Sequence, residues 1–294
     1  MTDLQAEFAK IFGDVEAVQY RAILHGLMSF FEQTSMQRRL DMLVEHYWAA
    51  KREASKNPLL KSGEKYFSQN DEDGITLEIV KRIGIKRGIA LEFGVGDGLE
   101  NNTLILLMSG WDVLWIDGED IKIRTPERCK NLSFRKDWVT KENCAMLASS
   151  CLEKHQRDHV DFLSIDLDGN DIHILGALLA SGLRPAILVV EYNGKFPPPI
   201  KWEIRYNPAH RWDGSDYQGA SLQSFTDLAE QYGYRLVCCN VTGVNAYFVR
   251  SEFSAHFQDV PEDIADIFYP ADYNWFVRRG HNVAPETIEA FLKI

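Results

Sequence analysis

Short apolar runs alternate with helix-like segments through the middle of the chain. The runs cover residues 88–94, 112–117, 132–135, 160–166 and 186–192 and are typical of strands. Between them, apolar residues recur every three or four positions over 74–83, 101–109, 141–154 and 172–181, as in amphipathic helices. Gly182 is suited to end the last helix. Continuous apolar strands separated by helices are covered on both faces, so the pattern predicts a doubly wound, Rossmann-like α/β fold.

The two ends of the chain depart from this alternation. A helix predicted over 221–232 is followed by strands at 235–239 and 246–249, and their closeness predicts an antiparallel edge on a mostly parallel sheet. Residues 1–57 have apolar positions at helical spacing and end at Asn57-Pro58. They predict a helical extension that acts as a lid or in self-association. The main domain then covers 58–250, and a helical tail interrupted by prolines covers 251–294.

The net charge and the cysteines indicate which substrates and which cellular compartment to expect. A formal net charge of -11 disfavours a nucleic-acid backbone as substrate, and the basic residues Lys122–Arg124, Arg128 and Lys130 are expected to form a solvated face. The five cysteines lack C-x-x-C spacing and Met1–Lys10 lacks the features of a secretory leader, so reduced thiols in the cytoplasm are expected. No run of about eighteen apolar residues occurs, so no membrane span is predicted.

A glycine loop follows the first predicted strand and precedes a helix. It reads Glu92-Phe93-Gly94-Val95-Gly96-Asp97-Gly98, with the spacing G-x-G-x-G instead of the dinucleotide fingerprint G-x-G-x-x-G. A carboxylate beside this loop suits the ammonium of an S-adenosylmethionine tail and would repel a diphosphate. The structural alternative is a tight turn without a ligand.

Two further acids follow later strands. Asp117 ends the second strand, where a carboxylate can accept hydrogen bonds from ribose hydroxyls; a loop cap is its structural alternative. Asp137 follows the third strand and is assigned to the adenine amino group or, equally, to a helix cap. The predicted cofactor-binding residues are therefore Glu92, Gly94, Gly96, Gly98, Asp117 and Asp137.

Acidic residues gather where the fourth and fifth strands end. Asp166 and Asp168 follow one strand and Glu191 ends the other, and both strands should reach the same carboxyl edge of the sheet. Helix capping explains Asp171 or its neighbours more readily than it explains acids that close buried strands. The predicted catalytic residues are Asp166, Asp168, Glu191 and, as a general base on the following helix, His173.

The same strand ends offer oxygen ligands. Asp166, Asp168, Glu191 and Asn193 supply only carboxylate and amide oxygens, which suit Mg²⁺ or Mn²⁺ better than Zn²⁺. Such an ion would lower the pKa of an acceptor hydroxyl. The sequence leaves open whether a metal, a carboxylate alone or His173 activates the acceptor.

Three segments carry a family resemblance. At Tyr66–Gly74, Glu92–Gly98 and Ile165–Asp171 the chain resembles the FkbM-type branch of S-adenosylmethionine-dependent O-methyltransferases, over roughly Tyr66 to Arg250. The resemblance implies a Rossmann-like domain that methylates hydroxyl groups of sugars, polyketides or other small molecules. Asp168 stands where glutamate is frequent in that branch.

A distinctive block, Tyr206–Ser215, follows the fifth strand and is rich in aromatic and charged residues. It is assigned either to an ordered surface loop or to the acceptor site, with Tyr206, His210, Arg211 and Trp212 as substrate-binding residues. The expected activity is O-methylation of a small molecule, sugar or glycan. The alternatives are a nicotinamide-dependent oxidoreductase and a non-catalytic nucleoside-binding subunit.

Overall fold

The structure, a computed structural model, describes residues 17–123 and 129–273. The chain divides into two compact units, Met1–Lys51 and Arg52–Ile294. Helix α2 (Ala17–Ala54) forms the described part of the first unit, and the predicted helical character of this region is confirmed for those residues. The role predicted for residues 1–57 stays a prediction. Residues 1–16 lie outside the described part of the chain.

Seven strands form one sheet in the second unit. Their order is β3-β2-β1-β4-β5-β7-β6, with only β7 antiparallel to its neighbours β5 and β6. The strands are β1 (Ile89–Phe93), β2 (Asp112–Asp117), β3 (Leu132–Lys136), β4 (Phe162–Ile165), β5 (Ile187–Glu191), β6 (Tyr234–Cys239) and β7 (Asn245–Arg250). The predicted doubly wound, mostly parallel sheet with an antiparallel edge is therefore confirmed.

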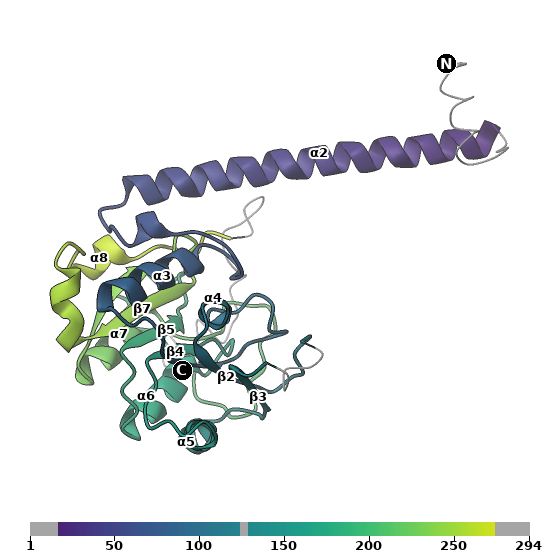
Figure 1. Cartoon of the computed structure of the whole chain (residues 1–294). Coiled ribbons are helices and arrows are strands. Elements are labelled where there is room, and N and C mark those ends of the chain that lie inside the picture. Colours follow the sequence, from purple (N-terminus) through teal and green to yellow (C-terminus); the bar gives the residue numbers. More distant parts are fainter. Residues whose placement is uncertain (1–16, 124–128, 274–294) are drawn as a thin grey trace. The chain divides into compact units, whose positions relative to one another are not determined.

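Helices cover the two faces of this sheet (Figure 1). Helices α5 (Cys144–Lys154), α6 (Asp171–Ala180) and α7 (Leu222–Gln231) contact one another in turn on one face. Helices α3 (Glu72–Ile83) and α4 (Leu104–Met108) lie on the other. Strands β1, β2, β4 and β5 are mainly apolar and almost wholly buried, as their sequence predicted, whereas the edge strand β3 is only partly buried. Short 3-10 segments occur at Leu60–Ser62 and Ser251–Phe257.

The helical tail is only partly confirmed. The 3-10 turn over Ser251–Phe257 and the short helix α8 (Ile264–Ile267) are separated by Pro261, so the described tail is not one continuous helix. Residues 274–294 lie outside the described part. Of the predicted basic face, Arg124 and Arg128 also lie outside it, whereas Lys122 forms an ion pair with Asp97 at 3.0 Å.

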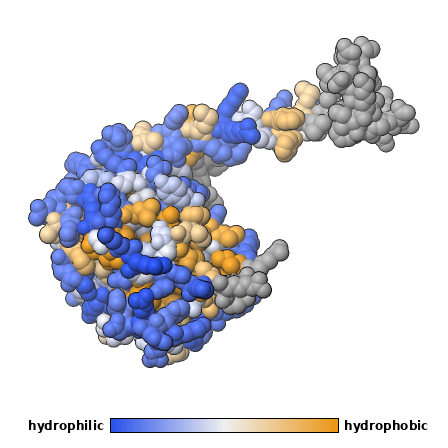
Figure 2. Space-filling view, in the orientation of Figure 1, coloured by the Kyte–Doolittle hydropathy of each residue, from blue (hydrophilic) through white to orange (hydrophobic). Residues whose placement is uncertain are grey.

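The surface of α2 is mixed in character. Met28, Phe30, Phe31, Met36 and Met42 are exposed on it. Figure 2 shows hydrophobic residues interspersed with hydrophilic ones along this helix. Within the described residues, none of the helices combines the length and the apolar composition needed to cross a bilayer.

The sheet brings distant segments together where its winding reverses. β1 pairs with β2 on one side and β4 on the other, and the chain leaves β1 and β4 toward opposite faces. A crevice opens beyond the carboxyl ends of strands at such a point, and ligands of doubly wound folds bind there. The glycine loop, Asp166 and Glu191 all lie at this edge.

Candidate functional site

The glycine loop is shaped by how closely it approaches β4. Gly94 has a φ of +81°, and a Cβ atom there would lie 1.6 Å from the backbone oxygen of Asp166. Only glycine permits this approach. Gly96 also has a positive φ, +53°, but a Cβ atom there would meet nothing within 4 Å. The backbone at Gly96 therefore faces open space in which a ligand can lie close to the main chain.

Asp117 holds the loop in this conformation. Its Oδ2 accepts hydrogen bonds from the backbone N–H groups of Val95 (2.7 Å) and Gly96 (2.9 Å), while Oδ1 accepts one from Glu119 (2.8 Å). The acid at the end of β2 thus fixes the glycine loop directly. The two features that suggested a nucleoside site in the sequence are one hydrogen-bonded unit in the structure.

Glu92 lies behind the loop, fully buried. Its carboxylate accepts hydrogen bonds from the backbone of Asn102 and Thr103 and from the side chains of Asn101 and Thr103, at 2.5–3.0 Å. Burial raises the pKa of this carboxyl, and the hydrogen bonds from Thr103 and Asn101 oppose that shift. Both oxygens are therefore engaged within the chain. Helix α4 begins just after these bonds, at Leu104, later than its apolar pattern predicted.

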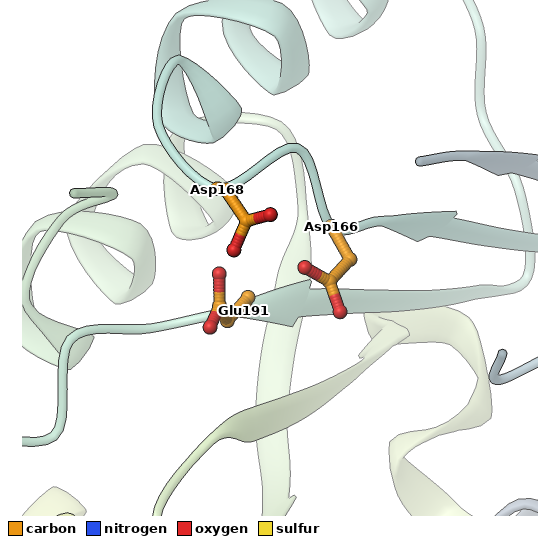
Figure 3. Close-up of side chains that lie close together, drawn as sticks. All are labelled: Asp166, Asp168 and Glu191. Carbon is orange, nitrogen blue, oxygen red and sulfur yellow. The ribbon is translucent and has the colours of Figure 1, made fainter. Parts of the chain in front are cut away.

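Three carboxylates converge at the ends of β4 and β5 (Figure 3). Oxygen atoms of Asp166, Asp168 and Glu191 lie within 4.8 Å of one another, and Glu191 Oε2 is buried without a hydrogen-bond partner among the described residues. Burial, followed by repulsion from the neighbouring acids, raises the pKa of Asp166 and Glu191 well above their usual range. The same causes raise the pKa of Asp168 to about 6. A divalent cation with hard-oxygen preference fits this donor set.

The turn that carries Asp168 is held by Asp171. Asp168 has a φ of +52°, a left-handed conformation that non-glycine residues rarely adopt. The buried carboxylate of Asp171 accepts hydrogen bonds from the backbone of Leu167 (2.7 Å) and Gly169 (2.8 Å) and so fixes this turn. Asp171 holds the turn before α6 and does not cap this helix, whose N-cap Asn170 makes no side-chain capping hydrogen bond. Asp168 is directed toward the other two acids (Figure 3).

Two cavities meet at these acids. The first, here called the loop cavity, has a volume of about 330 Å³, and the second, the tryptophan cavity, about 340 Å³. Gly94, Gly96, Asp166 and Asp168 line both. Of the residues that the structure describes, no Lys or Arg lines the loop cavity. Its lining includes seven carboxylates, from Glu72, Glu92, Asp97, Glu100, Asp166, Asp168 and Glu191.

The tryptophan cavity lies on the Asp117 side of the loop. The guanidinium of Arg211 stacks over the Trp138 ring at 4.6 Å, and Trp138 Nε1 donates a hydrogen bond to the Pro208 carbonyl at 2.7 Å. His210, Arg211 and Trp212 line this cavity with Trp138. Of the block assigned to the acceptor, these three residues therefore lie beside the glycine loop.

The block is fixed to the acidic turn. Asn170 Nδ2 donates to the Asn207 carbonyl at 2.8 Å, and Asn170 Oδ1 accepts from the Asn207 N–H at 3.3 Å. A Cβ atom at Gly169 would lie 2.3 Å from the His210 ring, so the ring packs in space that the glycine leaves. His210 Nε2 is buried without a hydrogen-bond partner in the described structure.

His173 and Tyr206 lie elsewhere. The His173 ring forms a hydrogen bond with the Ile204 carbonyl (2.9 Å) and packs on Tyr206, whose hydroxyl donates to Glu142. Both residues line a separate cavity of about 1000 Å³, which none of the three converging acids lines. The structure therefore does not bring His173 to the acidic cluster as the sequence suggested.

Two other predicted residues are also committed elsewhere. Asn193 Nδ2 donates to the carbonyls of Asp216 and Gln218 and its Oδ1 accepts from the Lys195 N–H, so both ends of its amide are engaged in the segment after β5, and Asn193 does not line the loop cavity. Asp137 forms an ion pair with Arg135 at 3.0 Å and lines neither the loop cavity nor the tryptophan cavity. Strand alternation placed Asn193 with Glu191, but the chain turns after β5 and breaks that relation.

Several residues that line the loop cavity were not predicted as site residues from the sequence. Gln69, Asn101, Asn102 and Asn245 contribute amide groups to the loop cavity. Asn102 Nδ2 donates to Ser164 Oγ (3.1 Å), which connects the glycine-loop segment to β4. Gln69 falls in one of the segments that carry the family resemblance, whereas Asn245 begins the antiparallel strand and is found only from the fold.

Sequence comparison with known proteins does not assign this chain to a family. No family model matches it, and no curated protein is similar in sequence. Among solved structures, it is similar to MycE methyltransferase of the mycinamycin biosynthetic pathway in complex with Mg, SAH and mycinamycin VI. That match has 16% identity and a TM-score of 0.37, and it covers 58% of this chain and 47% of MycE. This chain thus spans about half the length of MycE.

Two further solved structures are similar over nearly their whole length. The glycopeptide N-methyltransferase MtfA matches with 15% identity and a TM-score of 0.34, over 65% of this chain and 96% of MtfA. The methyltransferase domain of bacterial CtHen1 matches with 16% identity and a TM-score of 0.36, over 60% and 96%. The assignment of this chain to the doubly wound Rossmann-like fold rests on its own strand order and directions.

Proposed function

We propose that the protein is a methyltransferase that uses S-adenosylmethionine as methyl donor. The observation that carries this proposal is the loop cavity, which seven acidic side chains and none of the described lysines or arginines line beside the glycine loop. S-adenosylmethionine brings a sulfonium and an ammonium, and opposite charges attract strongly in a partly buried site. A dinucleotide would bring two phosphates against the same acids.

The two cavities suit the two halves of this donor. The tryptophan cavity, lined by Asp117 and Trp138, offers a carboxylate and an aromatic face to a nucleoside. The loop cavity then takes the amino-acid half, and the sulfonium lies near Asp166 and Asp168, which line both cavities. A fixed donor orientation supports catalysis, because the acceptor must approach the methyl group in line with the carbon–sulfur bond.

The acceptor in this proposal is a hydroxyl group of a small molecule, sugar or glycan. Asp166, Asp168 and Glu191 would hold Mg²⁺ or Mn²⁺, which when bound lowers the pKa of an acceptor hydroxyl. The carboxylates themselves orient the hydroxyl and accept its proton. The net charge of -11 makes a polyanionic nucleic acid an unfavourable acceptor.

Donor binding is the first test. Calorimetric titration of the full chain is expected to show binding of S-adenosylmethionine and S-adenosylhomocysteine and no binding of NAD. S-adenosylmethionine should bind more tightly, because only it carries the sulfonium charge toward the acids. Preferential binding of NAD would contradict the proposal and favour an oxidoreductase.

Acceptor chemistry is the second test. Radiolabelled methyl transfer is measured against nucleotide sugars, glycans and polyketides, with and without a chelator. We expect the chelator to suppress transfer, Mg²⁺ or Mn²⁺ to restore it, and S-adenosylhomocysteine affinity to change little. Asp166→Asn and Glu191→Gln should likewise each reduce methyl transfer while changing the affinity for S-adenosylhomocysteine little. Full turnover by demonstrably metal-free enzyme would refute the metal role, and donor binding without transfer to any acceptor would favour a non-catalytic nucleoside-binding subunit.

A further inference from the structure

Asn101 follows the glycine loop, and only one of the two polar atoms of its side-chain amide forms a hydrogen bond. Its Nδ2 donates a hydrogen bond to Glu92 Oε2 at 2.6 Å. Its Oδ1 is buried and accepts no hydrogen bond from the described residues. A buried carbonyl oxygen without a partner loses its hydrogen bonds to water and gains none within the protein, which costs free energy. Such atoms are rare in folded proteins.

The orientation of this amide is fixed. Glu92 is a carboxylate that accepts hydrogen bonds, so the nitrogen of Asn101 must face it and the oxygen must face away. Asn101 is only 8% exposed, and it lines the loop cavity. Among the side chains that line this cavity, only Asn101 Oδ1 and Glu191 Oε2 are buried oxygens without a hydrogen-bond partner in the described structure. An amide oxygen can only accept, so a ligand bound at Asn101 Oδ1 must donate.

We propose that Asn101 Oδ1 accepts a hydrogen bond from the α-ammonium of the donor's amino-acid half, and that Glu92 positions Asn101 for this contact. This inference rests on the proposed function. In this arrangement the Asn101 amide lies between the ammonium of the ligand and the buried carboxylate of Glu92. That carboxylate has no cationic partner in the described chain. Donation from Asn101 Nδ2 to Glu92 polarises the amide and makes Oδ1 a stronger acceptor.

Glu92 therefore acts on the ligand indirectly. The sequence placed its carboxylate beside the ammonium, but hydrogen bonds from Asn101, Asn102 and Thr103 already engage both of its oxygens. The specificity for an amine would then belong to Asn101. Glu191, whose Oε2 is the other unpartnered oxygen, belongs to the three converging acids that would hold the cation.

The test compares two ligands on two proteins. S-adenosylhomocysteine and its analogue with hydrogen in place of the α-amino group are titrated calorimetrically into wild-type protein and Asn101→Ala. A hydrogen bond to a charged group implies that wild type binds the analogue about 10- to 100-fold more weakly. In Asn101→Ala this ratio should fall at least about threefold below its wild-type value, mostly through weaker binding of S-adenosylhomocysteine, and the carboxylates of the loop cavity account for the preference that remains.

Asn131→Ala is the matched control. The amide of Asn131 donates to the carbonyls of Gly110 and Trp111, away from both cavities, so this variant should keep the wild-type ratio. If Asn101→Ala does not fold, the Asn101 side-chain amide resonances of the wild-type protein are followed by NMR. They should shift with S-adenosylhomocysteine and much less with the analogue.

The outcomes separate the two proposals. If wild-type protein binds neither S-adenosylmethionine nor S-adenosylhomocysteine, the proposed function is wrong. If it binds S-adenosylhomocysteine but discriminates equally against the analogue in wild type and Asn101→Ala, the inference is wrong and the function stands. Equal affinity of wild type for both ligands, or amide resonances that respond equally to both, also overturns the inference.

Discussion

Replacing Asp166 by asparagine should stabilise the protein while removing a group from its site. Asp166, Asp168 and Glu191 hold their oxygens within 4.8 Å of one another, and burial with mutual repulsion raises the pKa of all three. Asparagine keeps the shape of the side chain and removes one charge. Its amide can also donate to Glu191, whose Oε2 has no partner among the described residues.

Asp168 sets the scale of the effect. Its pKa rises from 3.8 to about 6, and at about 1.4 kcal/mol per pH unit this corresponds to about 3 kcal/mol when the group is ionised. Because Asp168 is exposed, solvent screening reduces this value to roughly half. Asp166 is less exposed and its pKa rises further. We therefore expect Asp166→Asn to raise the free energy of unfolding by about 2 kcal/mol at pH 8, or about 4–8 °C in Tm.

The pH dependence gives the sign. A carboxyl whose pKa is higher in the folded than in the unfolded state favours folding less as pH rises. The penalty from Asp166 is absent when both states are protonated, grows as pH rises above about 4, and is complete above the folded-state pKa. The difference in Tm between Asp166→Asn and wild type should therefore be small near pH 4 and largest near pH 8.

Thermal unfolding between pH 4 and pH 8, in chelator and in Mg²⁺ or Mn²⁺, measures this difference. The cation should stabilise wild type and have little effect on Asp166→Asn, because binding to the folded state alone raises stability. Asp158→Asn, at a carboxylate 97% exposed beside His159, should behave as wild type. An Asp166→Asn variant that is less stable than wild type at pH 8, or equally stable at every pH, would refute the account of the acidic cluster.

Three other changes give separate outcomes. Asp117→Ala removes the acceptor that holds Val95 and Gly96, so calorimetry should show S-adenosylhomocysteine affinity reduced by about 1.5–3 kcal/mol; unchanged affinity in a folded variant would exclude Asp117 from the site. His173→Gln lies in the separate cavity and should leave that affinity unchanged, and a tenfold loss would contradict this placement. Deletion of residues 1–51 removes exposed Phe30 and Phe31 and should change the oligomeric state in light scattering if the helix joins copies. A truncated chain that keeps the number of subunits per particle, the solubility and the activity of the full chain would show that the extension is dispensable.

The fold was predictable because its signals are local. Each buried strand is a continuous apolar run, and Ser221, whose side chain accepts from Ser224 N–H, begins α7 where the pattern placed it. Acids that close such strands must meet at one edge, so the convergence of Asp166, Asp168 and Glu191 followed from topology. Helix α4 covers only Leu104–Met108 and is shorter than predicted, and the N–H groups of Asn102 and Thr103 just before it donate to Glu92, a contact that the local pattern does not reveal.

The rest of the site depends on orientation and on contacts between distant segments. His173 lies near the acids in sequence, but each residue of a helix rotates the side-chain direction by about 100°, and the start of α6 directs His173 toward Tyr206. The hydrogen bonds that Glu92 makes with Asn101 depend on the exact path of the loop. Asn245 enters the cavity from a strand whose direction no single segment specifies.

The contact between Gly169 and His210 has a consequence for how such a protein can diversify. The ring occupies the space that a side chain at residue 169 would fill, and Asn170 binds the backbone of Asn207 in both directions. The two segments therefore cannot change independently. Among related chains, a larger residue at 169 should coincide with a smaller one at 210, and transplanting the 206–215 loop between homologues should succeed only when the turn at 168–170 is transferred with it.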